Sequence, residues 1–344
     1  MRIATYNVEW FNNLFDDAGN LLNDGEWSGR YDVTRREQIE SLGIVFTALD
    51  ADAIMVIEAP DHNGRRTTVT ALEKFAKELD LRAKKAVVGF GNHTQQEIAL
   101  LYDPFVFDAE HAPLGEQTGK KGSSDAPRFD SVFRIDLDID ATEDLVSFSK
   151  PPLELAVRHL SSEFEFCMIG AHLKSKAPHG AHGHDEVMRL AISNRRKQLA
   201  QAIWLRQRVA QHLAEGTPLM LLGDLNDGPG LDEYEHLFGR SSVEIVMGAG
   251  EELKLFDPHA AVALHRRPGV AVPSTARFYI AHEKRFLQAL LDYIMVSPDL
   301  AALAPVWRIW HPTDDPRCFA VPELRDALIF ASDHFPVSLD IALS

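Results

Sequence analysis

The chain is poor in cysteine, in long apolar runs and in the signature loops of several enzyme classes. Its 344 residues include two cysteines, Cys167 and Cys318, too few for a disulfide framework and not spaced as a metal-binding pair. No apolar run approaches the roughly 20 residues that span a bilayer. The sequence contains no Gly-x-x-x-x-Gly-Lys loop, no His-Glu-x-x-His and no Gly-x-Ser-x-Gly elbow. These absences argue against P-loop nucleotide hydrolases, zincin proteases and α/β-hydrolases.

The chain also has fewer basic than acidic residues. It carries 35 Lys and Arg against 51 Asp and Glu, a formal net charge of −16. A protein that holds nucleic acid by bulk electrostatics needs many phosphate-neutralising Lys and Arg side chains. Composition alone therefore argues against a nucleic-acid partner. Since no secretory signal follows Met1, the sequence predicts a cytoplasmic protein.

What the chain does have is the composition of a folded protein. Hydrophobic residues make up 45% and charged residues 25%, which indicates a large core and excludes a disordered or fibrous chain. Short apolar runs alternate with helical patterns, and no repeat, linker or composition shift divides them. We predict a single α/β domain over residues 1–344. Some neighbouring strands lie too close in sequence for a helical crossover, which predicts mixed strand pairing.

The expected elements follow from periodicity and capping. Thr34 and Glu37 have the spacing of a capping box, so a helix should begin there and run to about residue 49. Helical spacing of apolar residues predicts two further helices over 67–80 and 185–214. Strands are expected at 2–8, 53–57, 85–90, 97–102, 131–139, 153–160, 164–171, 218–223, 275–280, 289–297 and 335–342. Long loops, which often line a site, are expected at 12–33, 103–130, 174–184 and 305–331.

Polar side chains stand where the apolar runs begin or end. They are Asn7, Glu58, His172, Asp224 with Asn226, Asp292, and Asp333 with His334. In α/β sheets such side chains leave the core at one set of strand ends and can converge on a ligand. The set is rich in carboxylate and amide oxygens, which suits Mg²⁺ or Mn²⁺ better than zinc. The two-residue spacing of Asp224 and Asn226 places both side chains on one face of an extended segment.

Each of these residues, taken singly, also has an ordinary structural explanation. Asn7 can end a strand, His172 can be a hydrogen-bonded histidine at the edge of the core, and Asp and Asn often shape turns. Glu58 is the hardest to explain in this way, because a carboxylate near a core needs a partner. The conjunction of all six positions favours function. A Mg²⁺ site combined with a general base is the equipment for hydrolysing a phosphate ester.

The ordered motifs carry a family resemblance. They are Tyr6-Asn7-Val8-Glu9, Ile57-Glu58, His172-Leu173-Lys174-Ser175, Gly223-Asp224-Leu225-Asn226, Leu291-Asp292-Tyr293-Ile294 and Ser332-Asp333-His334-Phe335-Pro336-Val337. This set resembles the endonuclease/exonuclease/phosphatase superfamily, which includes deoxyribonuclease I, abasic-site endonucleases, sphingomyelinases and inositol-polyphosphate phosphatases. Bacterial nuclease-like members look most similar. The resemblance implies a four-layer α/β sandwich, with two packed mixed sheets flanked by helices.

The resemblance also implies a metal site. Glu58 would be the principal Mg²⁺ ligand, with Mn²⁺ as an alternative ion, and Asn7 and Asp333 would assist it. One departure concerns the residue before the metal-binding Glu, which is often Gln in the family and is Ile57 here. This departure bears on how the neighbouring phosphate is held, and less on the metal.

Catalytic and substrate-binding roles follow from the same resemblance. Asp224 would orient or deprotonate the attacking water, and Asn226 would hold the scissile phosphate together with Lys174. His334 would contact a phosphate oxygen, with Asp292 accepting its other N–H. His172 would stabilise the transition state or protonate the leaving oxygen. The sequence does not decide which group is the general base.

Three functional hypotheses follow. The first is a divalent-metal-dependent phosphodiesterase, a nuclease acting on DNA or RNA. The second is a phosphoesterase for a lipid, an inositol phosphate or another small ester, which the net charge of −16 favours somewhat. The third is a binding module that kept the fold and lost the chemistry. His179, His182 and His184 follow His172 closely and allow a zinc or manganese site, although the intervening glycines favour a loop.

Overall fold

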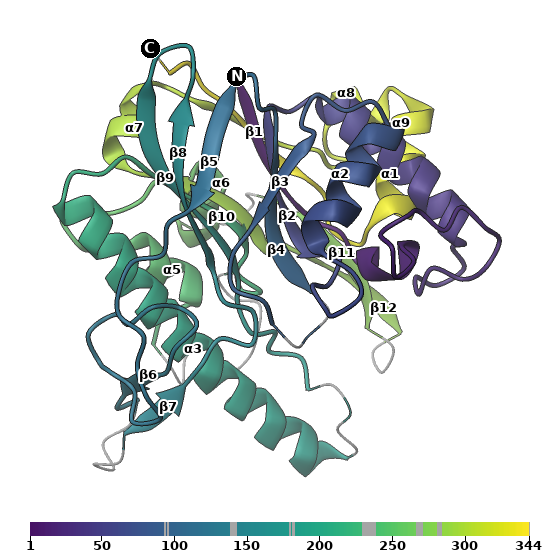
Figure 1. Ribbon diagram of the computed structural model, residues 1–344. Helices are drawn as coiled ribbons and strands as arrows, with labels where there is room; N and C mark the ends of the chain where they lie inside the picture. Colours follow the sequence, from purple (N-terminus) through teal and green to yellow (C-terminus); the bar gives the residue numbers. More distant parts are fainter. Residues whose placement is uncertain are drawn as a thin grey trace.

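Two mixed β-sheets pack face to face in the computed structural model (Figure 1). It describes residues 1–92, 94, 96–137, 143–178, 180, 183–228, 239–265, 271–280 and 284–343. The first sheet has the order β14 (Val306–Ile309), β15 (Val337–Asp340), β1 (Arg2–Asn7), β2 (Ala53–Ala59), β4 (Glu97–Tyr102) and β3 (Lys85–Val88). Only β1 and β2 pair in parallel within it, and the other pairs are antiparallel.

The second sheet has a similar mixed pattern. Its order is β13 (Asp292–Val296), β10 (Leu219–Asp224), β9 (Phe164–His172), β8 (Leu153–His159) and β5 (Phe107–His111). Here β9 and β10 are parallel and their neighbours antiparallel. Two short ribbons lie outside the sheets, β6 (Phe133–Ile135) with β7 (Asp144–Val146) and β11 (Ala276–Ile280) with β12 (Arg285–Ala289).

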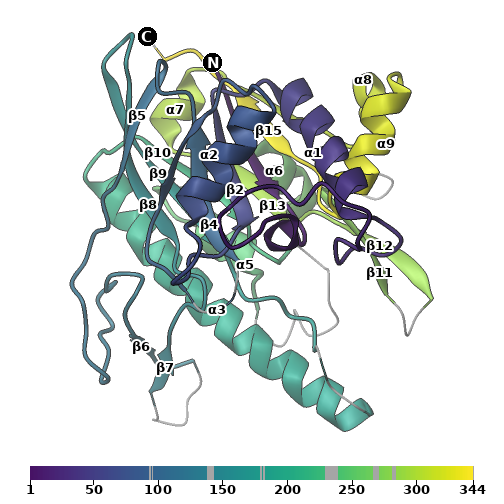
Figure 2. The ribbon, with the colours of Figure 1, turned by 45° about the vertical axis from the view of Figure 1, so that its right-hand side comes forward.

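Helices cover the outer faces of both sheets (Figure 2). Over the first sheet lie α1 (Arg35–Leu49), α2 (Thr68–Glu78) and α9 (Pro322–Ala331), whose apolar side chains share a core with β1 and β2. Over the second lie α3 (His184–Ala214), α5 (Ser242–Met247) and α6 (Pro258–Leu264). Among the described residues, the remaining helices are η1 (Phe11–Leu14), α7 (Pro298–Ala302) and α8 (Pro316–Phe319). None of the described helices is both long and apolar enough to cross a bilayer.

A third core fills the space between the sheets. Met55 of β2, Met168 of β9 and Leu222 of β10 meet there, all fully buried. Because strand residues alternate between two faces, each inner strand contributes one set of side chains to this core and the other to the helix-covered core. The result is the layer order helix, sheet, sheet, helix, which confirms the predicted four-layer sandwich.

The predicted helices are confirmed, including the capping box at α1. The Thr34 hydroxyl accepts from the Glu37 N–H at 3.3 Å, and the Glu37 carboxylate accepts from the Thr34 N–H at 2.8 Å. Both cysteines, Cys167 and Cys318, are free and buried, in agreement with the absence of a disulfide framework.

Several loop and strand predictions are wrong. The segment 103–130 contains β5, and the segment 305–331 contains β14, α8 and α9. The strand predicted at 289–297 is β13, which begins only at Asp292, and the separate strand β12, which ends at Ala289, was not predicted. The strand predicted at 131–139 is the shorter β6, and residues 138 and 139 lie outside the described part. These elements are short, so their periodicity covers too few residues to read.

A buried ionic cluster ties α3 to the second sheet. Arg208 donates to Glu154 at 2.6 Å, and His212 lies 3.0 Å from the other carboxylate oxygen. Burial alone would raise the pKa of Glu154, but the hydrogen bond with His212 and the charge of Arg208 outweigh it and lower that pKa. The stabilisation is therefore present above the unfolded pKa of about 4.3 and is lost as the pH falls through the lower folded pKa.

Replacing Glu154 with alanine is expected to destabilise the protein by about 3–5 kcal/mol, because it leaves the buried Arg208 charge uncompensated. Urea denaturation at neutral pH measures this. Glu110→Ala is the matched control, since Glu110 lies exposed on the neighbouring strand β5 and its loss should cost at most about 0.5 kcal/mol. Equal effects of the two substitutions would contradict the assignment.

Candidate active site

Four of the polar side chains stand at the carboxyl ends of parallel strands. Asn7 ends β1, Glu58 is the penultimate residue of β2, His172 ends β9 and Asp224 ends β10. Because β1 and β2 are parallel, as are β9 and β10, each pair of strands ends at one edge of its own sheet. The two edges lie at the same end of the sandwich, the end away from the N-terminus (Figure 1).

Two further strands begin at this end. β13 runs antiparallel to β10 and starts with Asp292, which pairs with Asp224 across the ladder. β15 runs antiparallel to β1, and Asp333 and His334 directly precede it. The sequence therefore places all six groups at one edge of the two sheets, as the pattern of apolar runs predicts.

Strand alternation turns the end residues of the two sheets toward each other. On β1, Asn7 shares its face with Ile3, and on β10, Asp224 shares its face with Leu222; both Ile3 and Leu222 belong to the core between the sheets. The Asn7 amide donates from Nδ2 to Oδ2 of Asp224 at 3.0 Å. This buried hydrogen bond joins the first sheet to the second at the site.

Glu58 reaches the site through a break in the strand pattern. Its backbone is in the left-handed region with φ 61°, and the pairing of β2 with β4 shifts register between Ile57 and Ala59. Even-numbered neighbours on β2, such as Val56, face the helix-covered core. The bulge therefore re-aims Glu58 toward the strand end. Ile57 is fully buried between the sheets, so it does not reach the site.

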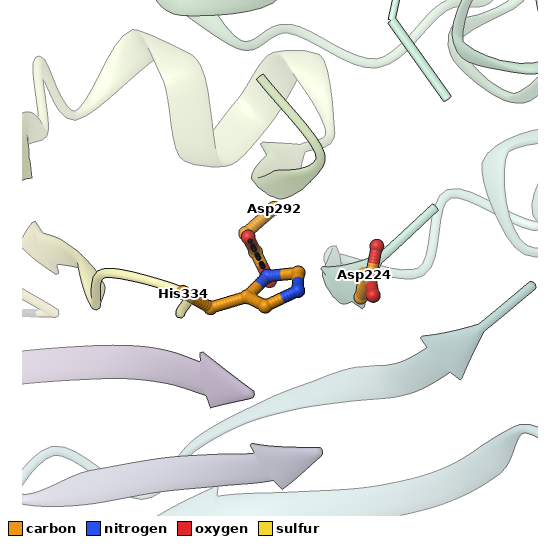
Figure 3. A group of neighbouring side chains, drawn as sticks. All are labelled: Asp224, Asp292 and His334. Carbon is orange, nitrogen blue, oxygen red and sulfur yellow. Dashed lines mark hydrogen bonds and ion pairs between the residues drawn. The ribbon is translucent and has the colours of Figure 1, made fainter. Parts of the chain in front are cut away.

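His334 and Asp292 form a buried hydrogen-bonded pair (Figure 3). His334 Nδ1 lies 2.8 Å from Oδ2 of Asp292. Burial alone would lower the pKa of His334, but the carboxylates of Asp292, Asp224 and Asp333 raise that pKa well above its usual range. The imidazole is therefore a cation at neutral pH, and Asp292 fixes its orientation.

Asp224 is a buried carboxylate with a strongly raised pKa. Burial is the main cause and raises the pKa of Asp224 to about 7, while the nearby His334 charge partly opposes it. The Asn226 backbone N–H donates to Oδ1 at 2.7 Å, and its side-chain amide donates to Oδ2 at 3.2 Å and to the Leu173 carbonyl at 3.1 Å. Asn226 thus holds Asp224 in place in this structure.

His172 is buried against a lysine. The Lys150 ammonium lies 3.1 Å from both ring nitrogens of His172, and His172 Nε2 lies 3.6 Å from Asp224 Oδ2 and 3.9 Å from Glu58 Oε1. Burial, and then the Lys150 charge, lower the pKa of His172 well below its usual range. A neutral His172 can donate a hydrogen bond through its one N–H but lacks the second, acidic proton of an imidazolium.

Sequence reasoning gave Lys150 no role in the site, although the segment Lys150-Pro151-Pro152-Leu153 also resembles the family. This lysine precedes β8, which runs antiparallel to β9, so Lys150 meets the end of β9 where His172 stands. That topological relation could have identified it, since a lysine before an apolar strand is otherwise unremarkable. Burial lowers the pKa of Lys150, and the nearby carboxylates of Glu58 and Asp224 oppose that effect.

Ser332 is a second supporting residue that was not predicted. Its hydroxyl donates to the Asn7 carbonyl at 2.8 Å and accepts from the His334 backbone N–H at 3.2 Å. It therefore fixes the segment that carries Asp333 and His334 against the end of β1. Lys174 is held by its backbone, which bonds Gln201 at 2.9 Å and Gln198 at 2.8 Å on α3.

The site contains buried oxygen atoms that could bind a cation. Buried oxygen atoms of Asn7 (Oδ1), Asp292 (Oδ1) and Asp333 (Oδ1) have no hydrogen-bond partner among the described residues. Burial raises the pKa of Glu58 to about 7, although the charges of Lys150 and His334 oppose this effect. An ion among such oxygens would satisfy these groups, and the amide and carboxylate chemistry suits Mg²⁺ or Mn²⁺.

Two neighbouring groups of residues could hold the ion. Ligand atoms of Asp224, Asp292 and His334 lie within 4.8 Å of one another (Figure 3). A protonated His334 has no lone pair to offer, however, and its Nδ1 is already engaged by Asp292. The oxygen atoms of Asn7, Glu58 and Asp333 form the alternative set, the one that the sequence predicts.

The histidines after His172 cannot be placed. His179, His182 and the side chain of His184 lie outside the described residues. The expected histidine-rich loop therefore remains a sequence prediction.

A family model described as the Endonuclease/Exonuclease/phosphatase family matches residues 4–334. The chain belongs to this family. Members of the endonuclease/exonuclease/phosphatase family are hydrolases that act on phosphoester bonds, and they typically use divalent metals. The match spans nearly the whole chain and confirms the predicted resemblance.

Three solved structures of other proteins are similar to this chain to different degrees. The structure of TDP2 from C. elegans has a TM-score of 0.50 and 14% identity, covering 99% of this chain and 75% of that one. The human Nocturnin catalytic domain with bound sulfate has a TM-score of 0.48 and 14% identity, covering 100% and 94%. The mannosyl-6-phosphatase Bt3783 of Bacteroides thetaiotaomicron has a TM-score of 0.48 and 14% identity, covering 100% of both chains. No curated protein sequence matches the chain significantly.

Proposed function

We propose that this protein is a divalent-metal-dependent phosphodiesterase, a nuclease that hydrolyses phosphodiester bonds in DNA or RNA. The observation that supports this most is the buried cluster at the strand ends, which combines oxygen atoms lacking partners with a cationic histidine. A structural cluster of this size would be expected to satisfy its own polar atoms. A cluster with unpartnered acceptor oxygens beside a cationic histidine is suited to an ion and a charged substrate.

Asn7, Glu58 and Asp333 would hold the ion. When bound, Mg²⁺ would neutralise charge on the phosphate and add to the stabilisation of the transition state. The two unpartnered buried oxygens of Asn7 and Asp333, with the carboxylate of Glu58, make up a set of hard ligands. Such a site leaves positions for water and phosphate oxygens, which Mg²⁺ commonly retains.

Asp224 is the proposed general base. Its pKa of about 7 matches a proton acceptor that works near neutral pH. Three hydrogen bonds from Asn7 and Asn226 orient its two oxygens. Asp224 would accept a proton from the attacking water, and Asn226 would position Asp224 and hold the scissile phosphate.

Two cations face the expected phosphate position. The His334 imidazolium, oriented by Asp292, would donate from Nε2 to a phosphate oxygen as negative charge builds in the transition state. Lys150 would supply a second positive charge beside His172, and Lys174 would bind a neighbouring phosphate oxygen. Neutral His172 would stabilise the transition state by donating a hydrogen bond.

The negative net charge of the chain favours a second candidate substrate. A net charge of −16 weakens long-range attraction of a polyanion, so a phosphoesterase acting on a lipid, inositol phosphate or other small ester remains the alternative. The same residues would serve either substrate, because the chemistry at phosphorus is the same.

A substrate panel tests the proposal. The purified protein is incubated with plasmid DNA, single-stranded RNA, sphingomyelin and inositol phosphates, with Mg²⁺, with Mn²⁺ and with EDTA. We expect cleavage of a polynucleotide that requires the metal and stops in EDTA. Hydrolysis of a small ester with no cleavage of any polynucleotide would support the alternative, and hydrolysis of none of these esters would contradict both.

A further inference from the structure

Trp10 presents an aromatic ring beside Glu58. The residue is 48% exposed and lines a hollow of about 80 Å³. The hollow is lined by Trp10, Phe11, Asn12, Asn13, Glu58, Thr94 and Gln96. Because Glu58 belongs to the proposed metal site, a group in this hollow would adjoin the reacting phosphate.

The backbone at Trp10 has a conformation that is unfavourable for a large side chain. Trp10 has φ 59° and ψ 20°, the left-handed conformation that bulky residues rarely adopt. Its ring lies against Gly29, where an added Cβ would come within 2.8 Å of the ring atom Cδ2. Strained conformations of this kind persist where the surrounding structure fixes them, and they cluster at ligand-binding positions.

The remaining wall of the hollow is polar. Asn12, Asn13, Thr94 and Gln96 contribute polar side chains to the lining. An aromatic ring beside such amide groups matches a nucleobase, which stacks through its π-face and offers donors and acceptors along its edge.

We propose that the Trp10 hollow is a subsite for one unpaired nucleobase adjoining the scissile phosphodiester. This inference rests on the proposed nuclease function and gives it a substrate class, a single strand or an unpaired segment. A base inside a duplex is stacked on both faces and paired along its edge, so it cannot also stack on Trp10.

Removing the base and removing the indole should have coupled effects. The substrates are single-stranded oligonucleotides with one cleavable linkage and an abasic nucleotide on its 5′ side, its 3′ side or neither. For the wild type, one abasic placement should lower kcat/KM on the order of 10- to 100-fold, the range expected for loss of one base–aromatic stack. For Trp10→Ala, the same placement should change kcat/KM by less than about 3-fold. Equal abasic penalties in both proteins would overturn the proposal.

Trp27→Ala is the matched control, since Trp27 is also exposed, at 62%, and belongs to the same N-terminal segment. It should keep the full abasic penalty of the wild type. Trp10→Phe should restore part of the penalty, which a purely structural role of the indole would not predict. Circular dichroism of all variants checks that the fold is retained.

A binding measurement separates this proposal from the proposed function. Nucleoside monophosphates should quench tryptophan fluorescence of the wild type and of Trp27→Ala, but much less in Trp10→Ala. Quenching without cleavage of any oligonucleotide would contradict the nuclease function and leave the subsite standing. Cleavage without Trp10-dependent quenching would support the nuclease function and contradict the Trp10 subsite. Trp10-dependent quenching by a sugar phosphate but by no nucleotide would mean that the hollow holds a sugar ring, and would overturn the proposal.

Discussion

Asp224→Asn is expected to lower kcat/KM for phosphodiester cleavage by about 10²- to 10⁴-fold, the usual contribution of a positioned general base. The substitution keeps the size of the side chain and leaves an oxygen that can accept from the Asn226 backbone N–H, which now donates to Oδ1 at 2.7 Å. It removes the group that can take a proton from water. Initial rates on a fluorescent oligonucleotide at saturating Mg²⁺ measure the loss.

The matched control is Asp299→Asn, because Asp299 is an exposed acid in α7. It should leave the rate within about 2-fold of the wild type. Thermal melting checks that Asp224→Asn is still folded. A folded Asp224→Asn protein with nearly wild-type activity would remove Asp224 from the mechanism.

Glu58→Gln is expected to weaken Mg²⁺ and Mn²⁺ binding by at least about 100-fold, the upper end of what the loss of an outer-shell partner costs. Glutamine keeps an oxygen but loses the negative charge that attracts the ion. Isothermal titration with Mn²⁺ measures the affinity. The exposed acid Glu165, at the far end of β9, gives the control variant Glu165→Gln, which should bind as the wild type does.

The metal affinity of the wild type should also depend on pH. Burial raises the pKa of Glu58 to about 7, so part of the protein carries a proton on this carboxylate at neutral pH. The ion competes with that proton, and affinity should therefore rise as the pH rises through 7. Unchanged affinity in Glu58→Gln, together with no pH dependence, would exclude Glu58 as the principal ligand.

The position of the site could be predicted from the sequence because it depends on strand ends. Each apolar run fixes where a strand leaves the core, and parallel pairing brings Asn7 to Glu58 and His172 to Asp224. Alternation then turns Asn7 and Asp224 inward. The placement of these residues at strand ends needs only the order and length of the apolar runs, which are local properties.

The parts of the site that depend on unusual backbone conformations could not be predicted from the sequence. Strand alternation alone points Glu58 toward the helix-covered face, and only the bulge at φ 61° re-aims it. The left-handed backbone at Trp10 is a similar exception. Lys150 was missed because its closeness to His172 depends on which strands pair, and pairing is a long-range property.

Helix α9 and strand β14 were not predicted, for a different reason. Helix α9 has apolar residues at Leu324, Ala327, Leu328 and Ala331, which is helical spacing, but its ten residues lie within a segment rich in proline and charge. The edge strand β14 has four residues, too few for a clear alternation. Tertiary packing forms these short elements, and α9 is held by its contact with α1.

The central claim is that the buried cluster uses a divalent ion to cleave phosphodiesters. The most direct measurement is the initial rate of single-stranded oligonucleotide cleavage by the wild type and Asp224→Asn as free Mg²⁺ is varied from zero. We predict no cleavage without metal, a saturable rise with Mg²⁺ for the wild type and a rate lower by about 10²- to 10⁴-fold for Asp224→Asn at saturation. Metal-independent cleavage, or equal rates for the two proteins, would contradict the account.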